Sequence, residues 1–337
     1  MSAERAQGAE RAQGAERAQG AERAQGAERA PGAQGTAAAR ARRRRRRTVR
    51  EAALGYLLVL PALAVFAVFV FYPFFENFRL ALYQTPPYPG LPSHYVGFHQ
   101  VSGVLTSSSF LQSLVSTLLF VVMVVPAGLL GGLLLAVAAH RRLRGMAVYR
   151  VVFSSTVISS VAVSALVFGT LMDPVVGLLP WLGLNPTPPI LQNTTWALPA
   201  IAVMAVWQFL GLSFIVMSAG LSAVPEEVLE AARVDGASER TVFWRVTVPL
   251  LSPTIFFGLV VATIYAFQTF GQVDILIGYS NAAFEHVNLL VYDILNTIEV
   301  AKTPGQAAVL SLVLFLLTLG VTLLQLRFLE RRVHYAD

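Results

Sequence analysis

With 337 residues, 55% of them hydrophobic and only 13% charged, the chain is too apolar for a water-soluble domain and belongs in a bilayer. It contains no cysteine, which excludes a disulfide framework and thiolate metal ligands. The formal net charge of +6 comes with arginines that flank apolar blocks, so nucleic acid is not an expected partner.

The amino-terminal region is a hexapeptide repeat, Ala-Glu-Arg-Ala-Gln-Gly, which runs from Ala3 to Gly26 and decays at Pro31. The repeat has no apolar face to bury, so residues 1–39 are predicted to form a disordered tail. Residues 40–53 contain a run of arginines and are predicted to be a basic juxtamembrane segment that faces anionic lipid headgroups.

Six apolar blocks follow, each long enough to cross about 30 Å of hydrocarbon as a helix of roughly 20 residues. They comprise residues 54–74, 111–139, 146–172, 196–221, 251–274 and 307–328. We therefore predict an all-α integral membrane protein in which residues 54–335 form a domain of six transmembrane helices.

The arginines predict the orientation, because basic residues accumulate on the cytoplasmic side of a membrane. They gather before the first block, between the second and third, between the fourth and fifth, and after the sixth. The loops on the other side carry Arg79 and Lys302 only. Both termini and the loop 222–249 are therefore expected to be cytoplasmic. Between the fifth and sixth blocks, the apolar periodicity of residues 284–300 predicts an amphipathic helix at the outer interface.

The loop 222–249 is charged yet has the pattern of two short helices. Pro225 suits a first helical position, and Glu226 and Glu227 complement the positive end of the helix dipole. Gly236 is predicted to end this helix. Ser238 is a candidate N-cap for a second helix that closes at Pro249.

This pattern resembles the cytoplasmic coupling loop of permease subunits from binding-protein-dependent ABC importers, whose signature is E-A-A, three residues, G, nine residues, then I-x-L-P. The corresponding residues here are Glu230-Ala231-Ala232, Gly236 and Val246-Thr247-Val248-Pro249. The spacing matches throughout, and two aliphatic positions carry valine. The resemblance implies that the loop docks in a cleft of an ATP-binding subunit and couples its motion to transport through Glu230, Ala231, Ala232, Arg233, Asp235 and Gly236.

Further stretches look like the sugar-type, maltose-type branch of these permeases, and the likeness covers about residues 50 to 335. They are Ser116–Phe120, Tyr149–Phe153, Asp173–Leu179 and Phe267–Asp274. The resemblance implies a multi-pass permease of the bacterial plasma (inner) membrane that imports a sugar or oligosaccharide by alternating access. Its implied partners are a second homologous permease subunit, two ATP-binding subunits and an extracytoplasmic solute-binding protein.

The chain is not expected to be an enzyme. Its single lysine, Lys302, has no glycine-rich loop before it, so no P-loop is present and ATP with its Mg²⁺ belongs on a partner chain. The histidines are scattered through loops and ends, at positions 94, 99, 140, 286 and 334. We therefore predict no catalytic, cofactor-binding or metal-binding residue in this chain.

Neutral polar and aromatic residues inside the blocks are candidates for the substrate path. They are Ser155, Ser159, Trp207, Gln208, Ser213, Tyr265, Gln268 and Gln272. Helical spacing predicts that Ser155 and Ser159 share one face and that the last three share another. For each residue taken alone, an interhelical hydrogen bond that holds the bundle together is the competing interpretation.

The blocks carry no ionisable residue near the membrane midplane, since Arg150 and Asp274 each lie near a block end. A self-sufficient secondary carrier would need such charges, so it is the weaker alternative. The lack of a central cationic pocket favours a neutral oligosaccharide or polyol over glycerol-3-phosphate, which stays open as an alternative substrate.

Overall fold

The computed structural model describes residues 55–84, 86, 92–140, 145–184, 186–278 and 281–329. The chain divides into two compact units, residues 1–73 and 74–337. The predicted tail 1–39 and basic segment 40–53 lie outside the described residues. The described part of the first unit is helical and includes the π-helix η1 (Ala67–Phe71).

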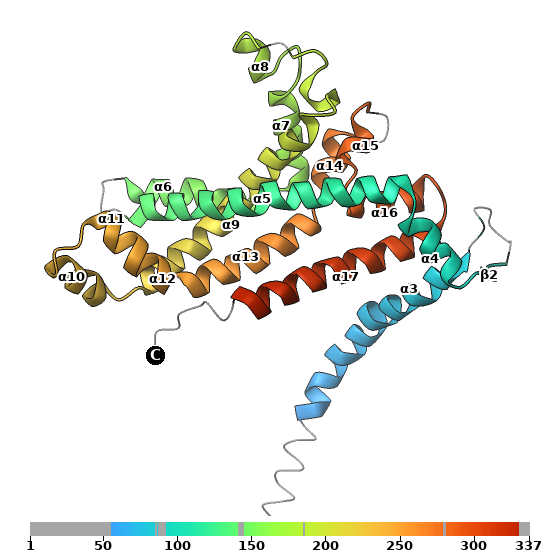
Figure 1. Cartoon of the computed structure of the whole chain (residues 1–337), viewed down its shortest axis with the longest axis horizontal. Coiled ribbons are helices and arrows are strands. Elements are labelled where there is room, and N and C mark those ends of the chain that lie inside the picture. Colours follow the sequence, from blue (N-terminus) through green and yellow to red (C-terminus); the bar gives the residue numbers. More distant parts are fainter. Residues whose placement is uncertain are drawn as a thin grey trace, which may run out of the picture. The chain divides into compact units, whose positions relative to one another are not determined.

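Helices dominate the described chain, in agreement with the predicted all-α class (Figure 1). Helix α3 (Tyr72–Leu82) leads into a short antiparallel ribbon in which Tyr83 of β1 (Tyr83–Gln84) lies opposite Tyr95 of β2 (His94–Tyr95). The remaining elements follow in order: α4 (Phe98–Leu105), α5 (Ser108–His140), α6 (Met146–Ser154), η2 (Ser155–Ile158), α7 (Val161–Leu171), α8 (Leu178–Trp181), η3 (Ile190–Gln192), α9 (Ala197–Ala223), α10 (Glu226–Val234), α11 (Glu239–Val242), η4 (Phe243–Thr247), α12 (Val248–Leu250), α13 (Ser252–Phe267), α14 (Gly271–Leu276), α15 (Phe284–Val287), α16 (Leu290–Glu299) and α17 (Pro304–Leu329).

Four helices in the described residues are long and apolar enough to cross a membrane: Gly55–Leu82, Ser108–His140, Ala197–Ala223 and Pro304–Arg327. Two bent helix pairs raise this number to as many as six, if each pair is one span. The predicted third and fifth spans are therefore not single straight helices, although the predicted positions of the other four agree with the long helices.

The predicted third span, 146–172, is broken between α6 and α7, whose axes differ by 105°. Ser155 begins a 3₁₀ turn, and Ser159 and Ser160 adopt extended backbone angles that no helix continues through. The Ser160 side chain then caps α7 by accepting from the Val163 N–H. The predicted fifth span, 251–274, ends early because α13 stops at Phe267, and a separate helix, α14, begins at Gly271.

The predicted amphipathic helix 284–300 is also divided. Helix α15 ends at Val287, Asn288 and Leu289 have extended backbone angles, and α16 begins at Leu290. The apolar periodicity did not indicate this interruption, and it gave the buried face only in part: α16 buries Leu290, Tyr292, Asp293 and Thr297, whereas Ile298 is 46% exposed.

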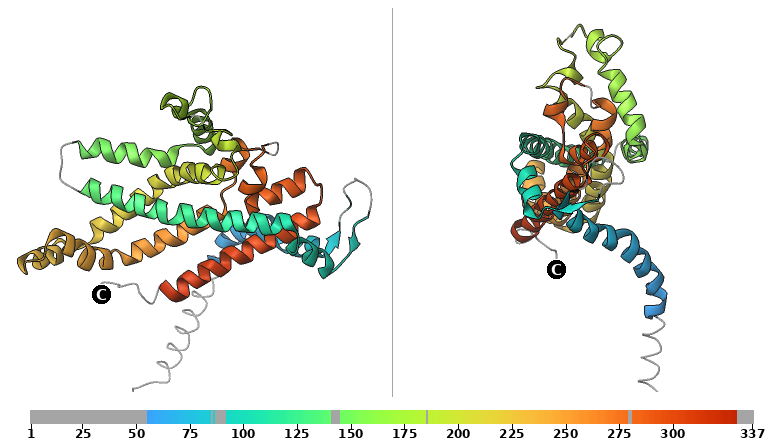
Figure 2. Two further views of the ribbon diagram at one scale, coloured as in Figure 1. Left: turned by 45° about the horizontal axis from the view of Figure 1, so that its top comes forward. Right: turned by 90° about the vertical axis from the view of Figure 1, so that its right-hand side faces the viewer.

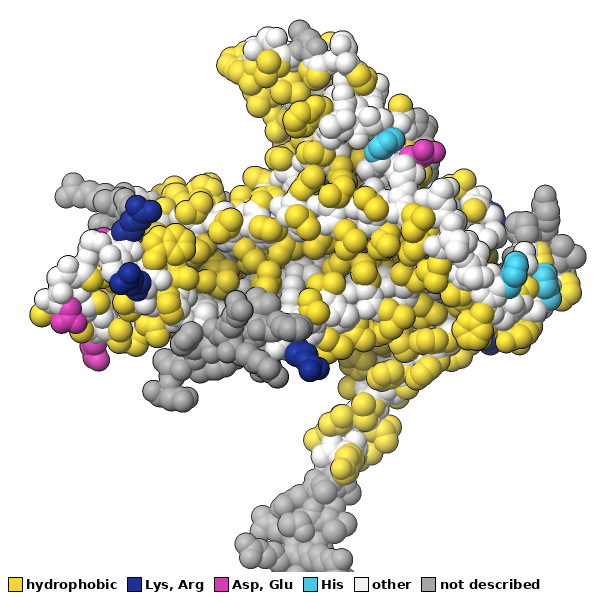
Figure 3. Space-filling model, in the orientation of Figure 1, with side chains coloured by type: hydrophobic (Ala, Val, Ile, Leu, Met, Phe, Trp, Pro, Cys, Tyr) yellow, Lys and Arg dark blue, Asp and Glu magenta, His cyan; other side chains and the backbone are white. Residues whose placement is uncertain are grey.

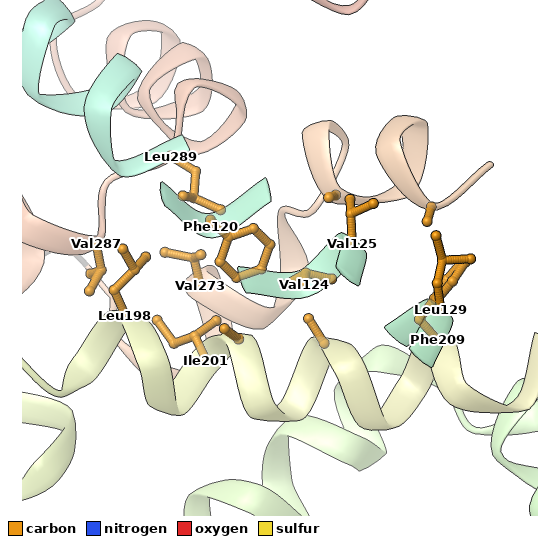
Figure 4. Packing of buried hydrophobic residues seen from close by; sticks show 14 of the residues in the cluster. Phe120, Val124, Val125, Leu129, Leu198, Ile201, Phe209, Val273, Val287 and Leu289 are labelled. Carbon is orange, nitrogen blue, oxygen red and sulfur yellow. The ribbon is translucent and has the colours of Figure 1, made fainter. Parts of the chain in front are cut away.

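In the second unit, α5 packs along α9 and α13, and α13 in turn packs on α17, as both Figure 1 and Figure 2 show. The core lies where α5 meets α9 and the segment 271–289. Figure 4 shows Phe120 and Val124 of α5 beside Ile201 of α9, with Val273 and Leu289 close to Phe120. All five side chains are almost fully buried.

Close approach of α5 and α9 depends on small residues, because apolar burial drives helices together only weakly in lipid, where packing takes over. A Cβ added at Gly128 would lie 2.8 Å from Cδ1 of Phe209. A Cβ added at Gly132 would lie 2.8 Å from the carbonyl carbon of Ser213, which is backbone and has little freedom to move. The two glycines thus set the spacing of the two longest described helices of the unit.

We expect Gly132→Ala to destabilise the protein by about 1–3 kcal/mol, because the new methyl group forces α5 away from α9. The melting temperature of the detergent-purified protein measures this effect. The matched control is Gly320→Ala in α17, where an added Cβ meets nothing within 4 Å. That control should be neutral or slightly stabilising, and equal losses in the two variants would contradict the proposed tight contact.

Candidate functional site

Helix α10 contains four of the six predicted coupling residues, Glu230 to Arg233, and is exposed along its length. It starts one residue later than predicted, because Pro225 is the N-cap with an extended ψ of 128° and Glu226 is the first helical residue. Glu226 and Glu227 occupy the first turn and Arg233 the last, so charges of the favourable sign lie at both ends of the helix dipole.

The predicted glycine stop is confirmed. Asp235 is the C-cap, and Gly236 has a φ of 82°, a left-handed value that favours glycine. The Gly236 N–H donates to the carbonyl oxygen of Arg233 at 3.0 Å, and the Ala237 N–H donates to that of Ala232 at 3.1 Å. This pair of bonds is a Schellman motif, which satisfies two carbonyls at the helix end and fixes the direction of the chain that follows.

The outward face of α10 combines charge, small size and apolar character. Glu227, Glu230, Ala231 and Val234 are spaced at three or four residues and all are exposed, whereas Leu229 and Ala232 are partly covered. Val234 is 87% exposed, which is unusual for an apolar side chain at the tip of a charged loop. Figure 3 shows charged side chains gathered at this end of the unit. Such a face suits contact with another protein.

On its inner side, α10 stands away from the bundle. A cavity of about 470 Å³ lies between the two, bordered by Leu229 and Arg233 of α10 and by Val137 and His140 at the end of α5. The link to α11 is polar, since Nε of Arg233 donates to Oε1 of Glu239 at 2.9 Å. This hydrogen bond, together with the carboxylate charge of Glu239, raises the pKa of Arg233.

Helix α11 carries the loop back to the membrane segment. Ser238 is its N-cap, as predicted, and its Oγ accepts from the Thr241 N–H at 3.3 Å. The buried contacts of this stretch come from Val242 and Thr247, while Trp244 is 59% exposed. The segment Glu239–Leu250 then meets α13 at an angle of 65°. The coupling loop therefore continues directly into a helix of the bundle.

Three of the eight predicted substrate-path residues come together in one polar cluster, formed by Gln208 of α9, Tyr265 of α13 and Gln272 of α14. Nε2 of Gln272 donates to Oε1 of Gln208 at 2.7 Å and to the hydroxyl oxygen of Tyr265 at 3.2 Å. The Tyr265 hydroxyl donates to the carbonyl oxygen of Ala205 at 3.4 Å. Gln208 and Gln272 are buried, at 9% and 3% exposure.

The other five predicted residues lie apart from this cluster. Ser155 donates to the Val152 carbonyl of its own turn, and Ser159 lies at the break before α7, so they do not share a helix face. Trp207 contacts Phe168 with the two rings tilted by 54°, and Ser213 is buried against Gly132. Gln268 is the exposed C-cap of α13, so the predicted common face with Tyr265 and Gln272 was wrong: the helix ends between them.

A second polar network was not predicted. It joins the start of α5 to the segment 286–293. Ser113 donates to Oδ2 of Asp293 at 3.1 Å, Ser116 donates to the His286 carbonyl at 3.1 Å, and Thr117 accepts from the Leu290 N–H at 2.9 Å. The signal in the sequence is the spacing of the three hydroxyl residues, which puts them on one face of a span.

Asp293 is 4% exposed, and its burial raises its pKa above the ordinary value, an effect that the hydrogen bonds from Asn288 and Ser113 oppose. The protonated form is thus favoured by folding. As pH rises from about 3.9 through the raised pKa, the folded protein loses stability, by up to about 1.4 kcal/mol per pH unit. We expect Asp293→Asn to lack this dependence. Melting temperatures of both proteins between pH 4 and 8 measure it, and parallel curves would contradict it.

Comparison with known proteins gives consistent matches. The family model described as binding-protein-dependent transport system inner membrane component matches residues 101–335. The chain is 36% identical, over 287 residues, to the sn-glycerol-3-phosphate transport system permease protein UgpA of Rhizobium meliloti (strain 1021), which covers 84% of this chain and 96% of the relative. It is 35% identical over 290 residues to the UgpA protein of Agrobacterium fabrum, with the same coverage.

Among solved structures, the fold is similar to that in the crystal structure of a bacterial ABC transporter involved in the import of the acidic polysaccharide alginate. The TM-score is 0.75 at 20% sequence identity, and the match covers 86% of this chain and 99% of that chain. The arrangement of helices described above is thus that of an ABC importer permease.

Proposed function

Because this chain belongs to the family of binding-protein-dependent transport system inner membrane components, we propose that it forms half of a substrate pathway driven by a separate ATPase. The observation that carries the proposal is α10, an exposed helix with a fixed glycine end at the point where the loop enters the bundle. Transport proceeds by alternating access, in which the pathway opens to one side of the membrane and then to the other.

The outward face of α10 is the proposed contact with the ATP-binding subunit. Ala231 permits close approach, Glu230 is available to pair with a basic group of the partner, and Val234 supplies apolar area. The Arg233–Glu239 hydrogen bond and the Gly236 turn tie α10 to α11, so a displacement of α10 is transmitted to α13. We propose that Arg233, which makes this hydrogen bond, and Asp235, the C-cap of α10, act in the transmission rather than in the contact.

The proposed topology has six spans, with α6–α7 and α11–α13 as the two bent ones and both termini in the cytoplasm. Support comes from the basic residues Arg150, Arg240 and Arg245, which lie at the end of the unit that carries α10. Residues 54–335 are the membrane domain, 222–249 the coupling loop, 40–53 a juxtamembrane segment and 1–39 a tail.

The proposed complex contains this chain, a second homologous permease, two ATP-binding subunits and an external solute-binding protein. ATP and Mg²⁺ bind to the ATP-binding subunits, and this chain contributes no catalytic group. The family description, which names dependence on a binding protein, supports the external partner.

The Gln208–Tyr265–Gln272 cluster is the proposed polar part of the substrate path. It joins three helical elements, α9, α13 and α14, and its amides pair with each other in the conformation described. Planar amides beside an aromatic ring suit sugar hydroxyls. The cluster is uncharged, which favours a neutral sugar or polyol as the first candidate substrate.

Glycerol-3-phosphate is the second candidate, favoured by the names of the relatives that are 36% and 35% identical. A phosphate needs basic donors, and the proposed cluster offers none. The second permease or the edge residue Arg150 would then have to supply them.

Affinity purification of the tagged chain from native membranes in mild detergent tests the proposed function. Recovery of an ATP-binding subunit and a second permease, with ATPase activity that an external binding protein stimulates, is the expected result. Recovery of this chain alone, together with transport in ATP-free vesicles, would point to a secondary carrier instead. Stimulation by sugar-loaded or by glycerol-3-phosphate-loaded binding protein decides between the two substrates.

A further inference from the structure

Among the described residues, Asp293 is a buried carboxylate without a counter-charge, at the end of α5 that is farthest from α10. Asp293 of α16 accepts hydrogen bonds from Oγ of Ser113 and from Nδ2 of Asn288, both at 3.1 Å. Within the described residues the recorded ion pairs join other side chains, Arg79 to Glu76 and Arg233 to Glu239. An ionised carboxylate that is 4% exposed is costly unless a cation approaches it.

Asp293 borders a cavity of about 220 Å³ beneath α4 and the first turn of α5. The other polar side chains at its wall are Ser107, Ser109, Thr297 and Gln306. One carboxylate among hydroxyl and amide oxygens matches a monovalent cation, because divalent ions usually require more than one carboxylate. The space is large enough for an ammonium or guanidinium head with its bridging water.

The cavity and α10 lie at opposite ends of α5. Phe110 borders this cavity, while Val137 borders the cavity under α10. At ~1.5 Å per residue, the two positions are separated by about 40 Å along the helix, more than the hydrocarbon thickness of about 30 Å. Figure 1 likewise shows α4 and α16 at one end of α5 and α10 at the other. If α10 meets the cytoplasmic ATPase, the cavity faces the external compartment.

We propose that this cavity receives a basic side chain, lysine or arginine, of the external solute-binding protein, with Asp293 as its partner. The proposal rests on the proposed function, which places a binding protein on this side. The carboxylate supplies charge complementarity, and Ser113 and Asn288 hold it in a fixed position before the partner arrives. Because Asp293 belongs to α16 and is hydrogen-bonded to Ser113 of α5, this bond would couple docking of the binding protein to both helices.

The test uses the complete importer in nanodiscs, titrated with the external binding protein that stimulates its ATPase activity. Asp293→Asn keeps the size of the side chain but removes the charge, and it is expected to weaken binding about tenfold at low salt. Methylammonium chloride, at the ionic strength of the sodium chloride it replaces, is expected to weaken binding to the unmodified importer and to leave the Asn variant unaffected.

Two controls make the result specific. Asp173→Asn removes one carboxylate from the loop after α7 and keeps an acceptor for the Val175 and Val176 N–H groups, so it matches the change in charge. Ser113→Ala removes a hydrogen bond to Asp293 and keeps the charge. Asp173→Asn should bind nearly as the unmodified importer does, whereas Ser113→Ala, which loses one of the two hydrogen bonds that hold the carboxylate, should weaken binding clearly less than Asp293→Asn does.

Unchanged affinity in Asp293→Asn would overturn the proposal. So would an equal loss in Ser113→Ala, because the carboxylate would then act only as a structural tie between α5 and α16. Failure of the unmodified importer to bind any external protein is a different outcome, which would overturn the proposed function itself.

Discussion

Gly236→Pro is expected to abolish ATP-driven uptake while leaving the subunit in the membrane. Proline fixes φ near −65°, whereas Gly236 has a φ of 82°, and it removes the N–H that donates to Arg233. The native end of α10 then becomes unfavourable by about 3 kcal/mol or more, a factor of roughly 100 in its population. When both activities are measured on the same reconstituted preparation, we expect ATP hydrolysis to continue while uptake is lost.

The chain offers a matched control for this change. Gly183 ends α8 with a φ of 76° and has the same pair of bonds, from its own N–H to Pro180 and from the Leu184 N–H to Leu179. An added Cβ meets nothing within 4 Å at either glycine. Gly183→Pro should therefore cause the same local damage far from α10 and keep uptake coupled. Coupled uptake in Gly236→Pro would contradict the role of α10.

Gln272→Leu is the second change with a large expected effect. It leaves the buried Oε1 of Gln208 without a donor, at a cost of about 1–3 kcal/mol, and removes a planar amide from the proposed substrate path. We expect the apparent KM for substrate to rise at least about tenfold in reconstituted transport, with the complex still assembled.

Gln325→Leu separates a substrate role from bundle stability. Gln325 of α17 is also buried, and its Nε2 donates to the Thr263 hydroxyl of α13 at 2.7 Å. Thr263 and Tyr265 lie about 200° apart around α13, so the two glutamines bond to different faces of that helix. Gln325→Leu should lower the melting temperature and leave KM unchanged. If both variants change stability alone, the cluster is an interhelical tie.

Local features of the chain were predictable because each depends on a few neighbouring residues. Gly236 at a helix end and Ser238 as an N-cap follow from backbone preferences, and both are confirmed. The long apolar helices around Ser108–His140 and Ala197–Ala223 follow from block length alone.

The helix breaks were not predictable in the same way. Ser155 to Ser160 contains hydroxyl side chains that a membrane helix tolerates, and the break there lies in close contact with α9, where a Cβ on Gly211 would meet the backbone nitrogen of Val157 at 2.9 Å. The Asp293 network also joins residues far apart in the sequence, Ser113 and Asp293, so the spacing of the hydroxyl residues in α5 indicates a polar face but not its partner.

Uptake of radiolabelled substrate into proteoliposomes that contain the purified complex tests the central claim most directly. Substrate should accumulate only when ATP is on the α10 side and the binding protein is on the other, and the Gly236→Pro complex should hydrolyse ATP without accumulation. Accumulation by this chain without ATP, driven by an ion gradient, would contradict the claim that it is the permease component of an ATP-driven importer.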